Sequence, residues 1–244
     1  MKYNIEPFEK GLETLGISLD QKQVQQFLKY YEVLIEWNKV MNLTGITEFN
    51  EVITKHFLDS LAIVKGCDFG KIETVIDIGT GAGFPGIPLK IAFPNLKIVL
   101  LDSLKKRINF LTEVVREIAV ENVETIHGRA EDFANKIEYR ESFDLVVSRA
   151  VANLSTLSEY CLPFVKVGGE FISYKSGEIV KEVSQAKKAV NVLGGEITSS
   201  EVFNLLDTDI ERSLVVIKKN RQTPKKYPRK AGMPSKEPIG STLC

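Results

Sequence analysis

A glycine-rich turn between an apolar run and an amphipathic one constrains this chain more than any other feature. The run Thr74–Ile78 reads TVIDI, which has the length and the β-branched content of a buried strand, and GTGAGFPGIPLKIAF follows it directly. Glycines allow a tight turn and a close approach of backbone to ligand at the carboxyl end of a strand. Pro85 suits the first turn of the helix that follows. The stretch therefore predicts a strand–loop–helix unit that can bind a nucleotide-like ligand.

Two overlapping glycine patterns leave the identity of that ligand open. Residues 81–86, GAGFPG, fit the G-x-G-x-x-G fingerprint of dinucleotide-binding proteins, whereas residues 77–83, DIGTGAG, fit the loop of class I methyltransferases. The second pattern begins where the strand ends. It also places the Asp77 carboxylate where a pyrophosphate would be repelled and the cationic groups of S-adenosylmethionine (SAM) would be attracted, by roughly 3 kcal/mol at about 5 Å. We therefore expect SAM rather than NAD, with Asp77, Gly79 and Gly81 among the residues that bind it.

Strand and helix patterns alternate over residues 72–220 and predict the fold class. The expected strands are TVIDI, KIVLLD, VETIHG, FDLVVS, GEFISY, EITSSEVF and RSLVVIKK. Only NLLDTDIE separates the last two, which is too short for a helical crossover, so the final strand should be antiparallel. These features predict an α/β fold with a Rossmann-like sheet, mostly parallel with an antiparallel last strand. That arrangement is typical of class I methyltransferases and is not expected in the dinucleotide-binding fold.

The chain is predicted to have three parts. Residues 1–70 form an N-terminal helical appendage, with helices from about Ser18 or Asp20 to Asn42 and from about Asn50 to Val64. Residues 71–220 form the SAM-binding methyltransferase domain, and residues 221–244 form an irregular basic tail. Eight basic residues and one acidic residue follow from Lys218 onward, which leaves 24 basic and 31 acidic residues in the rest of a chain of net charge zero. A basic tail on an acidic body suggests contact with nucleic acid.

Two further stretches are expected to complete a nucleoside site. Asp102 ends the second strand, where a carboxylate can accept hydrogen bonds from ribose hydroxyls, and it could also cap the next helix. Ala130 and Glu131 follow the third strand in GRAEDF, where an adenine would rest. The alternative for this pair is an ordinary helix start with acidic residues in its first turn.

The exit of the fourth strand, Ser148-Arg149-Ala150, bears on the methyl acceptor. It contains no Asn/Asp-Pro-Pro-Tyr/Phe motif and no cysteine, which disfavours methylation of exocyclic amines and of pyrimidine C5. Cys161 comes later and is expected to be a buried packing residue. Guanine N7 has a lone pair and no proton, so its methylation needs alignment rather than a general base, and no catalytic residue is assigned. Arg149 is expected either to line the cofactor pocket or to pair with Glu131 or Asp132.

Several classes of protein are disfavoured by the sequence. The three cysteines, Cys67, Cys161 and Cys244, suggest neither a disulfide framework nor a metal site. No apolar run is long enough to span a bilayer, and the charged N-terminus does not resemble a secretory signal. We expect a cytoplasmic protein without a membrane partner.

Seven blocks together resemble the RsmG family, also called GidB (glucose-inhibited division protein B). They read LIEWNKVMNLTGIT, KHFLDS, DIGTGAGFPGIPLKIAFP, LLDSLKKRINFL, GRAED, SRAVANLSTLSEYCLP and KKYPRKAGMPSKEPI, and they cover nearly the whole chain. The resemblance implies SAM-dependent methylation of guanine N7 in the decoding-region loop of 16S rRNA, with 16S rRNA or a small ribosomal subunit particle as partner. We expect the enzyme to be a monomer. It implies SAM contacts at Gly79, Phe84, Ala130, Glu131 and Arg149. His56 and Asn42, which lie in these blocks, are expected to pack or cap between the appendage and the sheet.

The tail is the expected substrate-binding segment. Its candidates are Lys225, Lys226, Tyr227, Arg229 and Lys230. The basic groups can reach phosphates and the tyrosine can stack on a base, whereas the alternative is a solvated terminus. Because guanine N7 lies in the deep groove of an RNA helix, the target base must be exposed or splayed out. A methyltransferase of small molecules or proteins and a non-catalytic nucleotide-binding module remain alternatives. The tail argues against the former, and the set of Asp77, Asp102 and GRAED argues against the latter.

Overall fold

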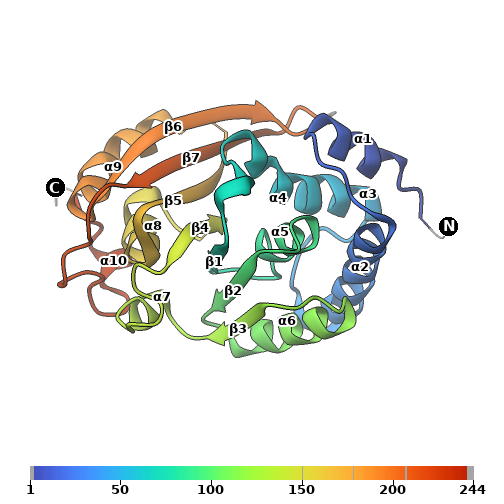
Figure 1. The fold of residues 1–244 in the computed structure, drawn as a ribbon, viewed down its shortest axis with the longest axis horizontal. Helices are drawn as coiled ribbons and strands as arrows, with labels where there is room; N and C mark the ends of the chain where they lie inside the picture. Colours follow the sequence, from blue (N-terminus) through green and yellow to red (C-terminus); the bar gives the residue numbers. More distant parts are fainter. Residues whose placement is uncertain (1–2, 150, 178, 207, 241–244) are drawn as a thin grey trace.

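The computed structural model describes residues 3–149, 151–177, 179–206 and 208–240, and Cys244 lies outside them. Within these residues one seven-stranded sheet has the order β3-β2-β1-β4-β5-β7-β6 (Figure 1). The strands are β1 (Thr74–Ile78), β2 (Lys97–Asp102), β3 (Val123–His127), β4 (Phe143–Arg149), β5 (Val165–Ser176), β6 (Gly195–Asn204) and β7 (Glu211–Lys219). The strands β1 to β5 pair in parallel, and β7 runs antiparallel to both β5 and β6. The predicted fold class is confirmed.

Helices cover both faces of this sheet, as expected for parallel strands that are apolar on both sides. Val75 of β1 belongs to the core on one face, and Ile76 belongs to the core on the other. The first face carries α5 (Gly86–Ala92) and α6 (Lys105–Glu117), and the second carries α8 (Leu154–Cys161) and α9 (Val180–Val192) (Figure 1). The one-turn helix α7 (Ala130–Phe133) follows β3. The helices expected after the first, second, fourth and fifth strands are confirmed to within about two residues; Glu178 lies outside the described residues.

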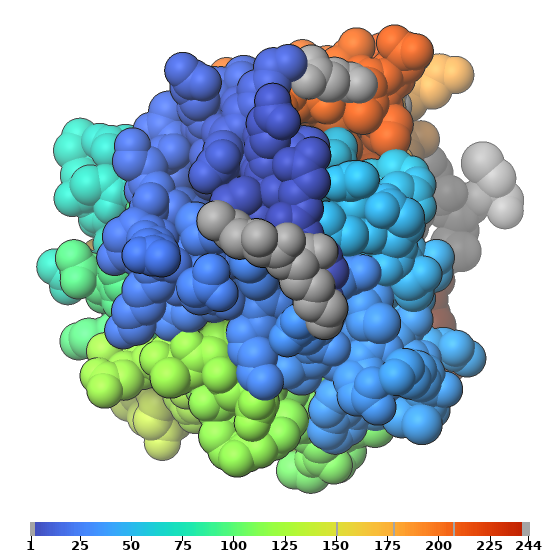
Figure 2. Space-filling view, turned by 90° about the vertical axis from the view of Figure 1, so that its right-hand side faces the viewer, coloured from blue at the N-terminus to red at the C-terminus, as the bar shows by residue number. Residues whose placement is uncertain are grey.

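The N-terminal residues form a series of helices outside α5 and α6. It comprises α1 (Glu6–Thr14), α2 (Gln21–Met41), α3 (Phe49–Val52), a π-helix (Ile53–Leu58), α4 (Asp59–Leu61) and a 3-10 turn (Ala62–Lys65). Asp20 caps α2 with a reciprocal pair of hydrogen bonds to Gln23, each 2.8 Å long. Asn42 ends α2 in the left-handed conformation, with φ of 47°. Figure 2 shows this side of the molecule, where the N-terminal helices occupy most of the visible surface above α6.

These helices share one apolar core with the sheet. Phe27, Tyr30 and Phe57 are fully buried and belong to the same cluster as residues of β1, α5 and α6. The Tyr30 hydroxyl donates a hydrogen bond to the Ala82 carbonyl, and its ring lies 5.4 Å from that of Phe84. The N-terminal helices therefore pack directly against the glycine-rich loop after β1.

The basic tail folds back against the second face of the sheet. Arg140 donates hydrogen bonds to the carbonyls of Thr223 and Tyr227, at 2.9 and 3.0 Å. Arg229 forms two charge-assisted hydrogen bonds with the fully buried Glu159 of α8, with Nε–Oε1 and Nη2–Oε2 distances of 2.9 and 2.7 Å. The expectation of an irregular segment holds except for the one-turn helix α10 (Met233–Lys236). Long-range contacts rather than regular structure hold the tail in place.

In the described parts of the chain, no helix has both the length and the apolar character needed to cross a membrane. No three metal-ligating side chains cluster there either.

The pair between Arg229 and Glu159 predicts a measurable loss of stability on truncation. Replacement Arg229→Ala removes the charged partner of a buried carboxylate and leaves it only the backbone amide of residue 229, which donates to Oε1 at 2.8 Å, so it should lower the free energy of unfolding by about 2–4 kcal/mol. Urea titration measures this change, and the exposed Lys226→Ala serves as a control expected to stay within about 0.5 kcal/mol. Adding Glu159→Gln to Arg229→Ala should restore part of the loss. Equal midpoints for Arg229→Ala and the control would show that the tail does not depend on this pair.

Candidate functional site

The carboxyl end of β1 holds a carboxylate in an unusual environment. Asp77 is fully buried, and its Oδ2 accepts hydrogen bonds from the Thr80 hydroxyl (2.7 Å) and the Gly86 amide (2.9 Å). Its Oδ1 is buried and has no hydrogen-bond partner among the residues that the structure describes. Burial raises the pKa of Asp77 to about 6, although the bonds from Thr80 and Gly86 oppose the shift. An unpaired buried oxygen is costly, and a cation that contacted it would offset this cost. Asp77 itself lines neither of the two cavities described below.

The loop after Asp77 needs glycine for its conformation and for space. Gly79 and Gly81 have φ of 70° and 62°, a region that other residues rarely adopt. A Cβ atom on Gly79 would also lie 2.6 Å from Cγ2 of Val151. The Gly81 amide donates to Oδ2 of Asp102 at 3.0 Å, which fixes the loop against the end of β2.

A cavity of about 360 Å³ lies beside this loop, at the carboxyl ends of β1, β2 and β3. Its wall includes Gly79, Asp102, Ala130 and Glu131, four of the residues expected to bind the cofactor. Asp102 also accepts a hydrogen bond from the Leu104 amide at 2.9 Å, in the turn before α6. The N-cap residue of α6 is Leu104, so Asp102 faces the cavity without being the helix cap. The adjoining carboxylates and glycine backbone match the hydroxyl and amine donors of a nucleoside.

The tail contributes to the same cavity, which the sequence did not indicate. Gly232 and Ser235 line it, and the Gly232 amide donates to Oε1 of Glu131 at 2.9 Å. The block KKYPRKAGMPSKEPI contains both residues, but its basic composition suggested binding of RNA rather than of the cofactor. The tail therefore bounds the nucleoside cavity through its backbone.

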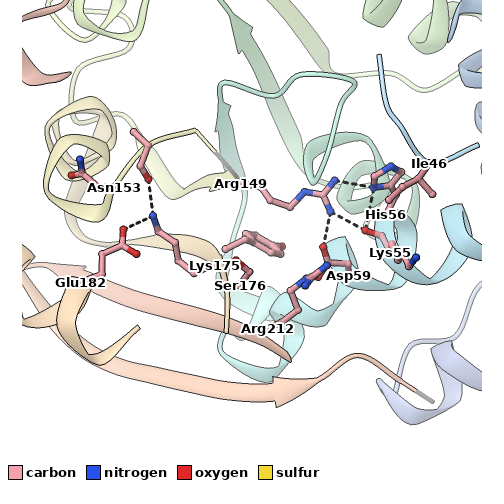
Figure 3. Close-up of a pocket in the computed structure, with 12 residues that line it drawn as sticks. Ile46, Lys55, His56, Asp59, Arg149, Asn153, Lys175, Ser176, Glu182 and Arg212 are labelled. Atoms are coloured by element: carbon pink, nitrogen blue, oxygen red, sulfur yellow. Dashed lines mark hydrogen bonds and ion pairs between the residues drawn. The ribbon is translucent and has the colours of Figure 1, made fainter. Parts of the chain in front are cut away.

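A second cavity, of about 590 Å³, lies by the carboxyl ends of β4 and β5 and the N-terminal helices. Its polar lining comprises Lys55, His56, Asp59, Arg149, Asn153, Lys175, Ser176, Glu182 and Arg212 (Figure 3). Val151 lines the first cavity, whereas Arg149, Ala152 and Asn153 line the second. The segment after β4 thus separates the two cavities.

Arg149 lies on the wall of the second cavity and pairs with a residue that was not predicted. Its Nη1 is 2.7 Å from Oδ2 of Asp59, while Arg212 Nε is 3.0 Å from Oδ1 of the same carboxylate. The predicted pairing of Arg149 with Glu131 or Asp132 is wrong, because Glu131 faces the first cavity and accepts from the tail. Asp59 belongs to KHFLDS, but nothing in the local pattern linked it to the end of β4.

Aromatic contacts connect Arg149 to the glycine-rich loop. The Arg149 guanidinium carbon lies 5.1 Å from the centre of the Phe84 ring, and the His56 ring stacks on Phe84 at 4.5 Å. His56 Nε2 lies 2.8 Å from the Thr44 hydroxyl, which confirms the expected packing role of His56. His56 also lines the second cavity. Burial, followed by the charge of Arg149, lowers the pKa of His56 to about 4. The histidine is therefore uncharged near pH 7.

The tail residues expected to bind substrate line neither cavity. Lys225, Lys226 and Lys230 are exposed, Tyr227 is half-buried against the core of the second face, and Arg229 is held by Glu159. Cys161 is fully buried in α8, as expected.

Comparison with solved structures agrees with this fold. The PH0226 protein from Pyrococcus horikoshii OT3 matches with a TM-score of 0.52 at 17% identity, over 76% of this chain and 99% of that one. StiE O-MT matches with a TM-score of 0.51 at 15% identity, over 69% and 78% of the two chains. At these identities the likeness concerns the fold alone, which is that of class I methyltransferases.

Comparison of sequences is more specific. The chain is 54% identical over 232 residues to "Ribosomal RNA small subunit methyltransferase G" of Lachnoclostridium phytofermentans, covering 95% of this chain and 96% of the relative. It is 52% identical over 234 residues to the protein of the same name from Brevibacillus brevis, covering 96% and 98%. The family model GidB, described as rRNA small subunit methyltransferase G, matches residues 23–213. The chain therefore belongs to the GidB family of small-subunit rRNA methyltransferases, as its sequence blocks indicated.

Proposed function

We propose that this protein methylates N7 of a guanine in the decoding-region loop of 16S rRNA, with SAM as the methyl donor. Membership of the family makes it a SAM-dependent rRNA methyltransferase. The observation that supports the proposal for the site is a pair of cavities separated by the segment after β4. One lies beside the loop after β1 and suits a nucleoside, and the other is large enough for an acceptor base. We further propose that it acts as a cytoplasmic monomer without a membrane partner, on 16S rRNA or on a small ribosomal subunit particle.

The residues around the first cavity fit SAM in chemical type. Asp102 and Glu131 offer carboxylate oxygens to hydroxyl and amine groups, and Gly79 and Ala130 leave room for close backbone contact. Asp77 and Gly81 lie outside the lining of this cavity; we propose that Gly81 shapes the loop and that the unpaired Asp77 oxygen attracts the charge of the cofactor. Bound SAM supplies a methyl group on a sulfonium, which a nucleophile can displace. We propose that Phe84 and Arg149 border the cofactor on the side of the second cavity, where they contact each other.

The second cavity suits an acceptor that needs no deprotonation. Its histidine is uncharged near pH 7, and both ring nitrogens contact the protein: Nε2 lies 2.8 Å from the Thr44 hydroxyl and Nδ1 lies 3.1 Å from the Lys55 carbonyl oxygen. Cys161, the cysteine of α8, is fully buried and outside both cavities. Guanine N7 attacks with its own lone pair, so the protein has to align the two reactants and exclude water. The names of the relatives and the exposed lysines of the tail favour an rRNA acceptor over a small molecule or a protein.

Incubation with labelled SAM and unmodified small-subunit particles tests the proposed reaction. The label should enter a single guanosine in the 16S rRNA. Because methylation at N7 makes the ring cationic and fragile, mild reduction followed by an amine should break the RNA at that nucleotide. Label on a cytosine, on an adenine amine or on a ribose would contradict the proposed acceptor.

The pKa of Asp77 predicts how SAM affinity depends on pH. The carboxyl group is half protonated near pH 6 in the free protein, and only its ionised form attracts the cationic ligand. SAM affinity should therefore be nearly constant above pH 7 and fall by up to about tenfold per pH unit below 6. Without SAM, the raised pKa has the opposite consequence for the fold. Between about pH 4 and pH 6 the unfolded chain has lost the Asp77 proton and the folded protein retains it, so stability falls as the pH rises through this range.

Calorimetry between pH 5 and pH 8 measures this dependence. Asp77→Asn should bind SAM more weakly and lose the dependence on pH, whereas Asp132→Asn, at an exposed position, should behave as the wild type. A wild-type affinity that is flat across this range would mean that Asp77 does not meet the charge of the cofactor.

The three exposed lysines of the tail predict the salt dependence of RNA binding. We propose that Lys225, Lys226 and Lys230 contact phosphates, with Tyr227 and Arg229 beside them at the RNA surface. Replacing the three lysines by alanine should lower the slope of log affinity against log salt by roughly 0.7 to 0.9 for each phosphate that the tail no longer neutralises. The affinity for SAM should stay within about twofold of the wild type, because these side chains lie outside the nucleoside cavity.

The matched control removes three exposed lysines elsewhere, Lys22, Lys97 and Lys187. It should leave the salt slope unchanged. If both triple variants change the slope equally, general charge rather than the tail governs RNA binding.

A further inference from the structure

One carboxylate oxygen of a residue on the wall of the larger cavity makes no hydrogen bond to the described part of the protein. Glu182 of α9 lines the cavity, and its Oε1 accepts hydrogen bonds from Lys175 Nζ (2.6 Å) and from the Leu154 amide (2.5 Å). Within the described part of the chain, its Oε2 has no hydrogen-bond partner, and the side chain is 29% exposed. Figure 3 shows this group on the side of the cavity opposite Arg149, Asp59 and His56. The free oxygen is available to a ligand that enters between the two sides.

Three elements hold this carboxylate in position. Lys175 comes from β5 and also donates to the Ala152 carbonyl at 2.7 Å, and the Leu154 amide belongs to the first turn of α8. One oxygen of Glu182 is thus committed to the protein, and its orientation directs the other to the cavity. A polar group positioned in this way can discriminate between ligands, because it loses little freedom when it binds.

We propose that this cavity receives the splayed-out target base and that Glu182 reads its Watson–Crick edge as guanine. The proposal rests on the proposed function and adds the group that selects the base. Guanine presents N1–H and N2–H₂ side by side, and the two lone pairs of a free carboxylate oxygen match these donors. Adenine presents the acceptor N1 at the same place, which would face the carboxylate without a hydrogen bond.

Other groups of the cavity complement the rest of a guanosine nucleotide. The side-chain oxygen Oδ1 of Asn153 accepts a hydrogen bond from the Thr156 backbone amide at 3.0 Å. The side-chain N–H₂ of Asn153 is therefore available as a donor for the guanine O6. Arg212 and Lys55 line the cavity from β7 and from the N-terminal helices, and they bring positive charge for the phosphates. A cavity of about 590 Å³ is large enough for a purine nucleotide.

Replacement of the target guanosine by inosine tests the assignment, because inosine keeps N7, N1–H and O6 and lacks only the 2-amino group. The substrates are reconstituted small-subunit particles with either nucleoside at the methylated position. The wild-type protein should prefer guanosine by about 10- to 100-fold in kcat/KM. In Glu182→Gln the ratio of the two kcat/KM values should fall to about 1, because the rate on guanosine should fall more than the rate on inosine. Glu201→Gln, the same substitution at an exposed position of β6, should keep the wild-type preference.

Thermal unfolding shows that each variant is folded, and calorimetry measures its SAM binding separately. Glu182→Gln could bind SAM normally and yet methylate neither substrate. In that case competition binding compares its affinity for the guanosine particle with its affinity for the inosine particle. Equal affinities support the assignment, and a retained preference for guanosine overturns it. A wild-type protein that does not distinguish inosine, or a variant that keeps the kinetic preference, also overturns it. Loss of SAM binding in Glu182→Gln alone would place the cofactor in this cavity instead of the base. If the wild-type protein methylates no guanine at all, the proposed function itself has failed.

Discussion

The carboxylate of Asp59 joins the parts of this molecule that form the larger cavity. It is 3% exposed and lies between Arg149, at the end of β4, and Arg212, at the start of β7. A buried carboxylate between two guanidinium groups is tolerated only because both of its oxygens are paired. The cluster therefore fixes the N-terminal helices against two strands of the sheet, and it holds Arg149 over Phe84. Its net charge is positive, which suits the phosphates of RNA or the carboxylate of SAM.

The helix that carries Asp59 changes its winding just before this residue. Residues Ile53–Leu58 form a π-helix, and α4 resumes at Asp59. Such segments are frequent at functional sites, because the extra residue in the turn alters which side chains share a face. Here Lys55, His56 and Asp59 all line the cavity. The N-terminal helices are thus one wall of the site as well as part of its core.

The sequence predicted the features that depend on local pattern. The strand TVIDI was predicted with its observed bounds, because a buried parallel strand is a continuous apolar run between turn residues. Gly79, Asp102, Ala130 and Glu131 were assigned to one site because the carboxyl ends of parallel strands meet at one edge. Contacts between distant segments were not predicted. Arg149 and Asp59 are 90 residues apart, and a charged residue carries no local sign of which opposite charge it will meet. The alternative that paired Arg149 with Glu131 or Asp132 was therefore wrong. The contact of the tail backbone with Glu131 was missed for a related reason: a backbone amide donor is the same in every residue except proline.

The arrangement of charge bears on the rate of the reaction as well as on the choice of base. When N7 of guanine gains a methyl group, the purine acquires positive charge, and its N1–H and N2–H₂ become stronger hydrogen-bond donors. A carboxylate placed at that edge therefore binds the ring more tightly as the transfer proceeds than it binds the neutral base. Lys175 holds one oxygen of Glu182 and leaves the other to respond, so the group is oriented before the charge develops. In this site, the interaction proposed to select guanine is thus also one that strengthens toward the transition state, without any transfer of a proton to the protein.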